Sequence, residues 1–269
     1  MPSSALLSQK RVVTAPLDVL DRFARAPFPE LRSLPPNRFR LRIGSGTRLL
    51  FNQHEYLLSG GASVAIKIFA IGLARFDSKI VDIGSGCGAL ASTLQRADAF
   101  VGTYTGIEVD LEMVDWCNER LSDGRFRFLH ADVYSRLYNP SGSRGPYTIP
   151  LDGGTYQLVM GESLFTHLLE DQVRRYIEES HRLLEDGGHI SMSVFCIDDM
   201  SSRGYLGGRW TFSRRLGNAY VENLKYPEAA VAYERAYLEA NVRAAGFSEV
   251  QVTPSLTGYN PQSLLVARK

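Results

Sequence analysis

The chain has 269 residues, of which 44% are hydrophobic, so it carries enough apolar material for one sizeable core. Lys and Arg number 30 against 29 Asp and Glu, and this balance argues against a general electrostatic attraction for nucleic acid. No apolar run approaches the ~20 residues of a membrane span, and the N-terminus is not typical of a signal peptide. Three cysteines without a CxxC pair favour reduced thiols in a cytoplasmic protein over a zinc ribbon or a disulfide framework.

Residues 1–60 are predicted to be an N-terminal leader and lid segment. Proline, serine and arginine interrupt the sequence up to Pro36, and only Leu17 to Ala26 has helical character, so we expect a mobile or loosely packed leader. Residues 41–62 mix apolar, aromatic and polar side chains without a clear period and could form a lid or an entry loop. His54, inside this stretch, is a candidate base and substrate contact.

From residue 61 to residue 269, predicted strands alternate with predicted helices. The strands are expected at 78–83, 104–109, 125–129, 156–161, 189–195, 250–253 and 264–267. The helices are expected at 63–75, 88–95, 111–121, 164–184 and 227–245, with Asp186-Gly187-Gly188 ending the fourth of them. This alternation predicts an α/β domain with a mostly parallel, doubly wound sheet and helices on both of its faces. A loop at 134–154 and an insertion at about 197–226 interrupt the pattern.

The strongest local signal is a glycine loop that follows the first strand directly. Gly84, Gly86 and Gly88 form G-x-G-x-G before a helix, where backbone and helix N-terminus can approach a ligand closely. Dinucleotide-binding loops prefer G-x-G-x-x-G, so the third glycine stands one residue too early for NAD. Asp82 precedes the loop and would repel a pyrophosphate. Glu108, at the end of the next strand, is placed to accept hydrogen bonds from ribose hydroxyls.

Five segments resemble class I S-adenosylmethionine (SAM)-dependent methyltransferases in their order and spacing. They are DIGSGCG at 82–88, GIE at 106–108, HADV at 130–133, YQLVMGESLFTHLL at 156–169 and LLEDGGHISMSVF at 183–195. The resemblance runs from about Ala65 to Lys269 and implies a seven-stranded sheet of order 3-2-1-4-5-7-6, with the last strand antiparallel. Residues 1–60 lie outside the core that this family shares.

The resemblance also implies the residues that would bind SAM. Asp82 and Gly84 would flank the methionyl part, Gly86 would let the cofactor backbone pass, and Glu108 would hold the ribose, where the family more often has Asp. Asp132, followed by Val133, would meet the adenine amino group. The full cofactor-binding set is Asp82, Gly84, Ser85, Gly86, Glu108, Val109, Asp132, Val133 and Gly161.

Methylation of a hydroxyl needs a base near the attacking oxygen, and His167 is the first candidate because it follows the tip of the fourth strand. Glu162 lies at the same tip and is a tentative substrate contact. Glu162 with Asp198 and Asp199 could hold a divalent metal such as magnesium, although an ordinary solvated turn explains the two aspartates equally well, and no metal is assigned. Tyr205 and Trp210 in the insertion are tentative substrate contacts. The alternative interpretations of these aromatic residues are a partly buried cover and a homodimer surface.

The favoured function is O-methylation of a small polar molecule, with saccharides slightly ahead of aromatic metabolites. N- or C-methylation of a small metabolite is an alternative that needs no base, and a SAM-binding protein without turnover is another. Neither a nucleic acid nor a membrane is an expected partner. The strand-four tip MGES differs from the N-P-P-Y type, which resembles enzymes that methylate nucleic-acid amino groups.

Overall fold

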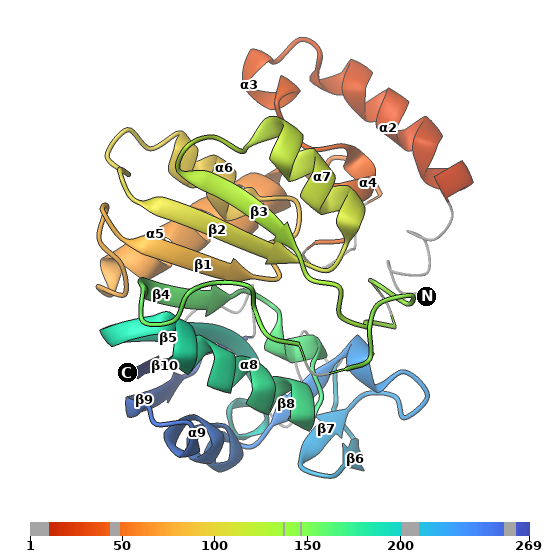
Figure 1. Ribbon diagram of the computed structural model, residues 1–269. Helices are drawn as coiled ribbons and strands as arrows, with labels where there is room; N and C mark the ends of the chain where they lie inside the picture. Colours follow the sequence, from red (N-terminus) through yellow and green to blue (C-terminus); the bar gives the residue numbers. More distant parts are fainter. Residues whose placement is uncertain (1–10, 44–48, 137, 146, 201–209, 256–261) are drawn as a thin grey trace. The chain divides into compact units, whose positions relative to one another are not determined.

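The computed structural model describes residues 11–43, 49–136, 138–145, 147–200, 210–255 and 262–269. The chain divides into two compact units (Figure 1). The first unit is formed by residues 1–77 and 85–146, and the second by residues 78–84 and 147–269. The N-terminal segment therefore belongs to the same unit as most of the glycine loop and the two strands that follow it.

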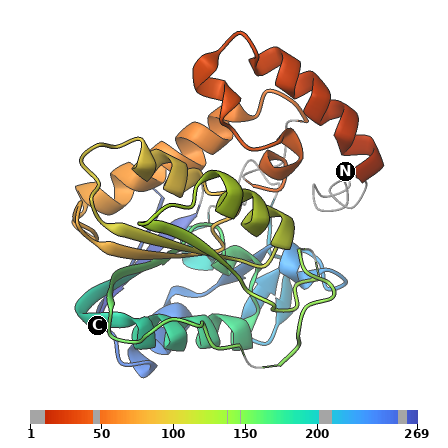
Figure 2. The same cartoon turned by 45° about the horizontal axis from the view of Figure 1, so that its top comes forward.

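Residues 11–43 of the first unit contain the helices α2 (Arg11–Arg25), α3 (Pro29–Arg32) and α4 (Asn37–Arg40). Arg40 is 1% exposed and forms an ion pair with buried Asp21, which also pairs with Arg25 at 2.8 Å. Asn52 accepts a 2.9 Å hydrogen bond from Nε of Arg40. A buried ionic network needs fixed partners, so residues 11–43 are not the loosely packed leader that the sequence predicted. Figure 2 shows α2, α3 and α4 as one group, with α4 near the start of α7.

The next helix of the first unit begins as a π-helix. The π-helical part, η1 (Glu55–Ala62), continues directly into α5 (Ser63–Ala70). The helix that was predicted at 63–75 therefore begins eight residues earlier, at Glu55, and ends at Ala70, before Gly72 with its φ of +74°. The stretch that was predicted as a lid or entry loop is helical over its last eight residues.

The remainder of the first unit is a strand-helix-strand segment that follows the glycine loop. It contains α6 (Ala89–Gln95), β2 (Thr103–Glu108), α7 (Leu111–Arg120) and β3 (Phe126–His130). β2 and β3 pair in parallel, from Tyr104 opposite Phe126 to Glu108 opposite His130. α7 packs against both strands, as the crossover helix between parallel strands does. This register brings Glu108 and His130 to the same edge.

The second unit is built around three parallel strands, β1 (Lys79–Ile83), β4 (Tyr156–Gly161) and β5 (Leu184–Cys196). β1 and β4 are buried along nearly their whole length, as expected for strands that are covered on both faces. β10 (Ser263–Arg268) lies antiparallel between β5 and β9 (Ser248–Thr253). On the same sheet, β8 (Val231–Tyr233), β7 (Ala219–Val221) and β6 (Arg214–Leu216) follow the end of β5.

Two predicted helices of the second unit end or begin elsewhere. The helix expected at 164–184 is a 3-10 turn, η2 (Phe165–His167), followed by α8 (Glu170–Leu183), because Leu168 adopts extended backbone. β5 begins at Leu184, so Gly187 and Gly188 lie inside the strand and do not cap the helix. Pro227 starts a short 3-10 turn, η5 (Pro227–Ala229), and α9 (Arg235–Ala244) begins only after β8. Residues 231–233 form a strand and not the predicted helix, because residues 230–233 are fully buried against β5 and β7.

The predicted α/β class is confirmed, and the strand order agrees within each unit. β3 lies beside β2 in the first unit, and β1-β4-β5-β10-β9 in the second has the predicted antiparallel strand between the fifth and sixth predicted strands. The described residues form ten strands where seven were predicted, because the insertion adds β6 and β7 and the start of the last predicted helix forms β8. None of the helices in the described part of the chain is long and apolar enough to cross a membrane.

Candidate functional site

The part of the glycine loop that belongs to the first unit, residues 85–88, is held by hydrogen bonds inside that unit. The amide of Ser85 donates to the Ile107 carbonyl, and the amide of Gly88 donates to the Ser85 carbonyl, both at 3.1 Å. Gly86 and Gly88 have φ values of +55° and +73°, a region that L-residues with side chains rarely adopt. The loop is therefore a fixed turn that presents backbone groups at the start of α6.

Glu108 is the acidic residue that organises this loop. One carboxylate oxygen accepts a 2.9 Å hydrogen bond from the Gly86 amide, and the other accepts from the amides of Val109 and Asp110 at 2.8 and 2.9 Å. Burial raises the pKa of the Glu108 carboxyl, while the three backbone donors oppose that rise. A carboxylate has about four acceptor positions, so three are occupied and Glu108 would have to share its oxygens with a ribose.

The N-terminal segment covers the loop from the side of Gly86. A Cβ placed on Gly86 would lie 3.1 Å from Cγ2 of Ile43. The neighbouring Arg42 forms ion pairs with Asp110, the N-cap of α7, and with Glu112 at 3.5 Å. This contact ties the end of the N-terminal helices to the acidic turn that follows β2.

A second acidic turn of the first unit lies after β3. Asp132 is exposed and accepts a 2.7 Å hydrogen bond from the Ser143 hydroxyl and a 3.4 Å bond from the Asn139 amide, and these bonds lower its pKa. Val133 forms a parallel bridge with Ser143, so the loop folds back over the end of β3. Burial, helped by the charge of Glu108, raises the pKa of Tyr138 to about 12.

In the second unit, the predicted cofactor residues lie at the ends of β1 and β4. Asp82 is buried on β1, and Gly84 follows it at φ +76°. Gly161 ends β4, and a Cβ there would lie 2.9 Å from the Met192 sulfur and 3.2 Å from the Ile83 carbonyl oxygen. Any larger residue at Gly161 would therefore push β4 away from its neighbours. Asp82, Gly84 and Gly161 therefore lie near the ends of two parallel strands, where the sequence predicted them.

His167, the predicted base, lies in η2 just after this strand end. Its Nδ1 is 2.9 Å from the Glu228 carbonyl oxygen, which only accepts hydrogen bonds, so Nδ1 carries the proton. In the neutral ring, Nε2 is then the basic nitrogen. Burial lowers the pKa of His167 below its ordinary value, so the imidazole is neutral at pH 7. A neutral, oriented histidine is a group that can accept a proton.

Comparison with known proteins identifies the domain to which these residues belong. Residues 80–188 match a family model that is described as a methyltransferase domain, and the match spans β1 to β5 with the glycine loop, Glu108, Asp132 and Gly161. Over these residues the chain is similar to methyltransferase domains.

Solved methyltransferase structures share the fold at low sequence identity. The putative methyltransferase of Haloferax volcanii, solved with the Trm112 methyltransferase activator, is 16% identical with a TM-score of 0.54, over 81% of this chain and 90% of that chain. SibL in its apo form is 18% identical with a TM-score of 0.55, over 99% and 73%. Geranyl diphosphate C-methyltransferase of Streptomyces coelicolor is 14% identical with a TM-score of 0.52, over 77% and 80%. The match to SibL extends over the N-terminal helices of this chain as well.

The tentative metal ligands that the sequence suggested are not brought together. Asp199 forms an ion pair with Arg235 and accepts a 2.6 Å bond from the Ser263 hydroxyl. Asp198 accepts a 2.7 Å bond from the Arg235 amide at the start of α9. Among the residues that the structure describes, no three His, Cys, Asp or Glu side chains could hold a metal ion together. The two aspartates connect β5 to α9 and β10, which is a structural role.

The aromatic residues of the insertion are mostly committed to packing. Trp210 and Tyr220 pack against a small core of Phe195, Phe212, Ala230 and Ala232. The Tyr220 hydroxyl also donates to the Glu234 carboxylate. Tyr205 lies outside the described residues. The interpretation of the insertion as a partly buried cover therefore fits Trp210 better than that of an open platform.

Three of the other four histidines lie in different settings. Nε2 of His130 is 3.2 Å from the Val109 carbonyl oxygen. His181 packs edge-on against Phe247 at 5.0 Å between ring centres. His54, the second candidate base, precedes η1 in the first unit and is partly buried.

Sequence reasoning missed Tyr56, Arg42 and Ser143, which contact the loop, the Asp110 turn and Asp132, respectively. All three lie in stretches without regular periodicity, and their partners are far away in the sequence. The glycine pair after Tyr56 was the one local signal, because adjacent glycines inside a helical stretch often mark a close approach of backbones.

Proposed function

We propose that the methyltransferase moves a methyl group from SAM to a hydroxyl of a small polar molecule, with His167 as the general base. The observation that carries the proposal is the setting of His167, whose Nδ1 donates to the Glu228 carbonyl and whose partly buried ring has a pKa lowered below its ordinary value. The comparisons support the methyltransferase activity, and they include a C-methyltransferase, so the hydroxyl acceptor is our own inference.

We propose the following residues for SAM binding, from the resemblance of the motifs. Gly86 with Ser85 would approach the cofactor through backbone, Glu108 would hold the ribose, and Asp132 with Val133 would meet the adenine. The proposed contacts of the methionyl part are Asp82, Gly84 and Gly161, with Val109 beside the ribose site. The donor set fits this use, because Ser85 Oγ is buried without a hydrogen-bond partner in the described protein, inside a loop whose backbone is already fixed.

When bound, SAM supplies an electrophilic methyl group on a sulfonium sulfur. Glu108 orients the cofactor through acceptor oxygens whose positions are fixed by three amides. Nε2 of His167 would accept the proton of the acceptor hydroxyl as the methyl group is transferred to its oxygen. The Glu228 carbonyl fixes the ring and stabilises the imidazolium that results, much as an orienting acceptor does in other catalytic pairs.

The acceptor class is a small hydroxylated molecule, and we keep saccharides as the first to test. Trp210 and Tyr220 add little support for a sugar platform, because they pack against the insertion's own core. Glu162 and His54 stay proposed substrate contacts. We assign no metal, and magnesium enters only as a variable of the assay. Three buried cysteines, two of which (Cys87 and Cys196) have thiol pKa values raised by burial to about 12, suit a reducing, cytoplasmic setting.

The test is a screen of hydroxylated acceptors for methyl transfer, with and without magnesium, on the parent and on His167→Ala. The matched control is His189→Ala, because burial lowers the pKa of this histidine on β5 too, but it lies away from η2. The proposal predicts turnover that the first variant loses and the second keeps. Equal turnover of all three proteins would favour the alternative of N- or C-methylation, which needs no base.

A further inference from the structure

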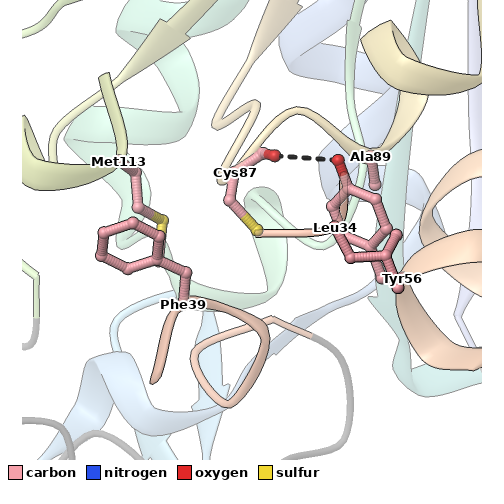
Figure 3. Close-up of a cluster of buried hydrophobic side chains, with 6 residues drawn as sticks. All are labelled: Leu34, Phe39, Tyr56, Cys87, Ala89 and Met113. Carbon is pink, nitrogen blue, oxygen red and sulfur yellow. Dashed lines mark hydrogen bonds between the residues drawn. The ribbon is translucent and has the colours of Figure 1, made fainter. Parts of the chain in front are cut away.

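Tyr56 is a buried tyrosine whose hydroxyl reaches the glycine loop (Figure 3). The side chain is 1% exposed and comes from η1, in the N-terminal segment that precedes the family domain. Its hydroxyl oxygen is 3.1 Å from the carbonyl oxygens of both Cys87 and Gly88. Burial raises the pKa of Tyr56 well above its ordinary value, so the hydroxyl stays protonated and donates.

The Cys87 carbonyl depends on this donor more than the Gly88 carbonyl does. Gly88 already accepts a 2.9 Å bond from the amide of Ser92, the first regular bond of α6. The Tyr56 proton can serve one acceptor at a time, and Cys87 precedes the helix, outside its ladder of bonds. The peptide between residues 87 and 88 is therefore oriented from outside the loop by Tyr56.

The π-helix and its two glycines explain how the phenol comes this close. A Cβ on Gly61 would lie 2.3 Å from the Thr93 hydroxyl oxygen and 3.1 Å from the Ala89 carbonyl oxygen, and a Cβ on Gly60 would lie 3.0 Å from Cβ of Ala89. Only residues without side chains let η1 pack directly against α6. π-helical turns are rare and are frequently found at functional sites, and this one carries Tyr56.

The same cluster anchors the rest of the N-terminal segment to the loop. Tyr56 and Cys87 share a buried core with Leu34, Phe39, Ala89 and Met113, and Figure 3 shows the tyrosine and cysteine side chains within that core. Ile43 and Leu57 pack against it as well. The loop is thus fixed on two sides, by Glu108 at the Gly86 amide and by Tyr56 at the Cys87 carbonyl.

We propose that Tyr56 is a positioning residue for SAM binding, which sets the conformation of the glycine loop from the N-terminal segment. The proposal rests on the proposed function, because it takes residues 85–88 to be a part of the SAM site. Tyr56 contacts the loop carbonyls and not the reacting atoms. Its loss should therefore change the affinity for the cofactor while the chemical step at saturating SAM stays intact.

The test replaces only the hydroxyl, with Tyr56→Phe, and measures the dissociation constant of S-adenosylhomocysteine by calorimetry and kcat at saturating SAM. We expect the dissociation constant to rise about tenfold, as the loss of one buried hydrogen bond implies, and kcat to stay within twofold. Hydrogen exchange of the peptide that spans residues 85–92 should become faster. Tyr233→Phe is the matched control, because its buried hydroxyl also donates to a carbonyl, that of Leu168 at 2.8 Å, away from the loop.

A folded Tyr56→Phe protein with parental affinity and parental exchange would overturn the assignment. Equal losses of affinity in both variants would also overturn it, since they would reflect general destabilisation and not the loop. A parent chain that fails to bind S-adenosylhomocysteine would instead contradict the proposed function itself. That outcome is separate, because it is read on the parent before any variant is compared.

Discussion

Replacing Glu108 tests the link between loop geometry and cofactor affinity. Glu108→Gln keeps the shape of the side chain and one carbonyl oxygen, but the other oxygen becomes an NH₂ group. The remaining oxygen can serve the adjacent amides of Val109 and Asp110, which leaves the Gly86 amide opposite a second donor. Glu108→Ala removes the acceptor of all three amides.

The structure sets the size of these effects. A buried donor that loses its partner costs about 1–3 kcal/mol, and hydrogen bonds to charged groups contribute about 1.5–3 kcal/mol. One lost bond in Glu108→Gln therefore predicts a weakening of SAM binding by at least about tenfold, since 1.4 kcal/mol corresponds to a factor of ten. Glu108→Ala orphans three amides and should also lower the melting temperature. Glu108→Asp keeps the charge and should bind SAM better than the alanine variant does.

Calorimetric titration with SAM between pH 4 and 8 is the assay. Burial raises the pKa of Glu108, so the parent should lose affinity on acidification at a pH above the ordinary glutamic acid value, because a protonated carboxyl loses acceptor capacity. Glu108→Gln cannot titrate and should show a flat profile over the same range. Parental affinity in Glu108→Ala, or a pH profile that is unchanged by Glu108→Gln, would refute the reasoning.

Three further predictions concern catalysis, the glycine loop and the N-terminal helices. The acidic limb of the kcat–pH profile should lie below pH 6.5, because burial lowers the pKa of His167 and the ring must be deprotonated to act as a base. His167→Ala should lower kcat by roughly 10²–10⁴-fold and remove this limb. A parental kcat in the variant would make this histidine structural. Gly86→Ala should weaken SAM binding more than Gly72→Ala, which has a similar φ of +74° but open space around its Cβ, and equal effects would mean that only backbone strain matters. In urea unfolding, Arg40→Met should lower the free energy of unfolding by about 3 kcal/mol or more, because buried Asp21 loses one of its ion-pair partners. Breaking the more exposed pair of Arg38 and Asp18 should lower it by less than about 1 kcal/mol. Similar losses of stability would contradict the burial argument.

The parts of the fold that follow from local sequence were predicted well. The β-branched run before the glycine loop and the strand that ends at Glu108 have periodicity and turn residues that specify them without help from distant partners. The strands β1 to β4 and the helices α6 and α7 were therefore placed to within one residue at each end. His167 was also found just past a strand end, although as part of a 3-10 turn.

The elements that were missed depend on distant partners. β8 has the sequence of a helix start after Pro227 but is buried between β5 and β7, so tertiary packing overrides local propensity. The N-terminal helices are held by the ion pair of Arg40 with Asp21, which lies 19 residues away in the sequence. No pattern in the sequence links Tyr56 to the Cys87 carbonyl, 31 residues further on. Such contacts exist only after the chain has folded.

Titration of the parent protein with S-adenosylhomocysteine, with NAD as the comparison ligand, tests the central claim most directly. The early third glycine and the Glu108-organised loop predict saturable binding of S-adenosylhomocysteine with one site per chain and no measurable heat with NAD. Binding of NAD without binding of S-adenosylhomocysteine would contradict the account.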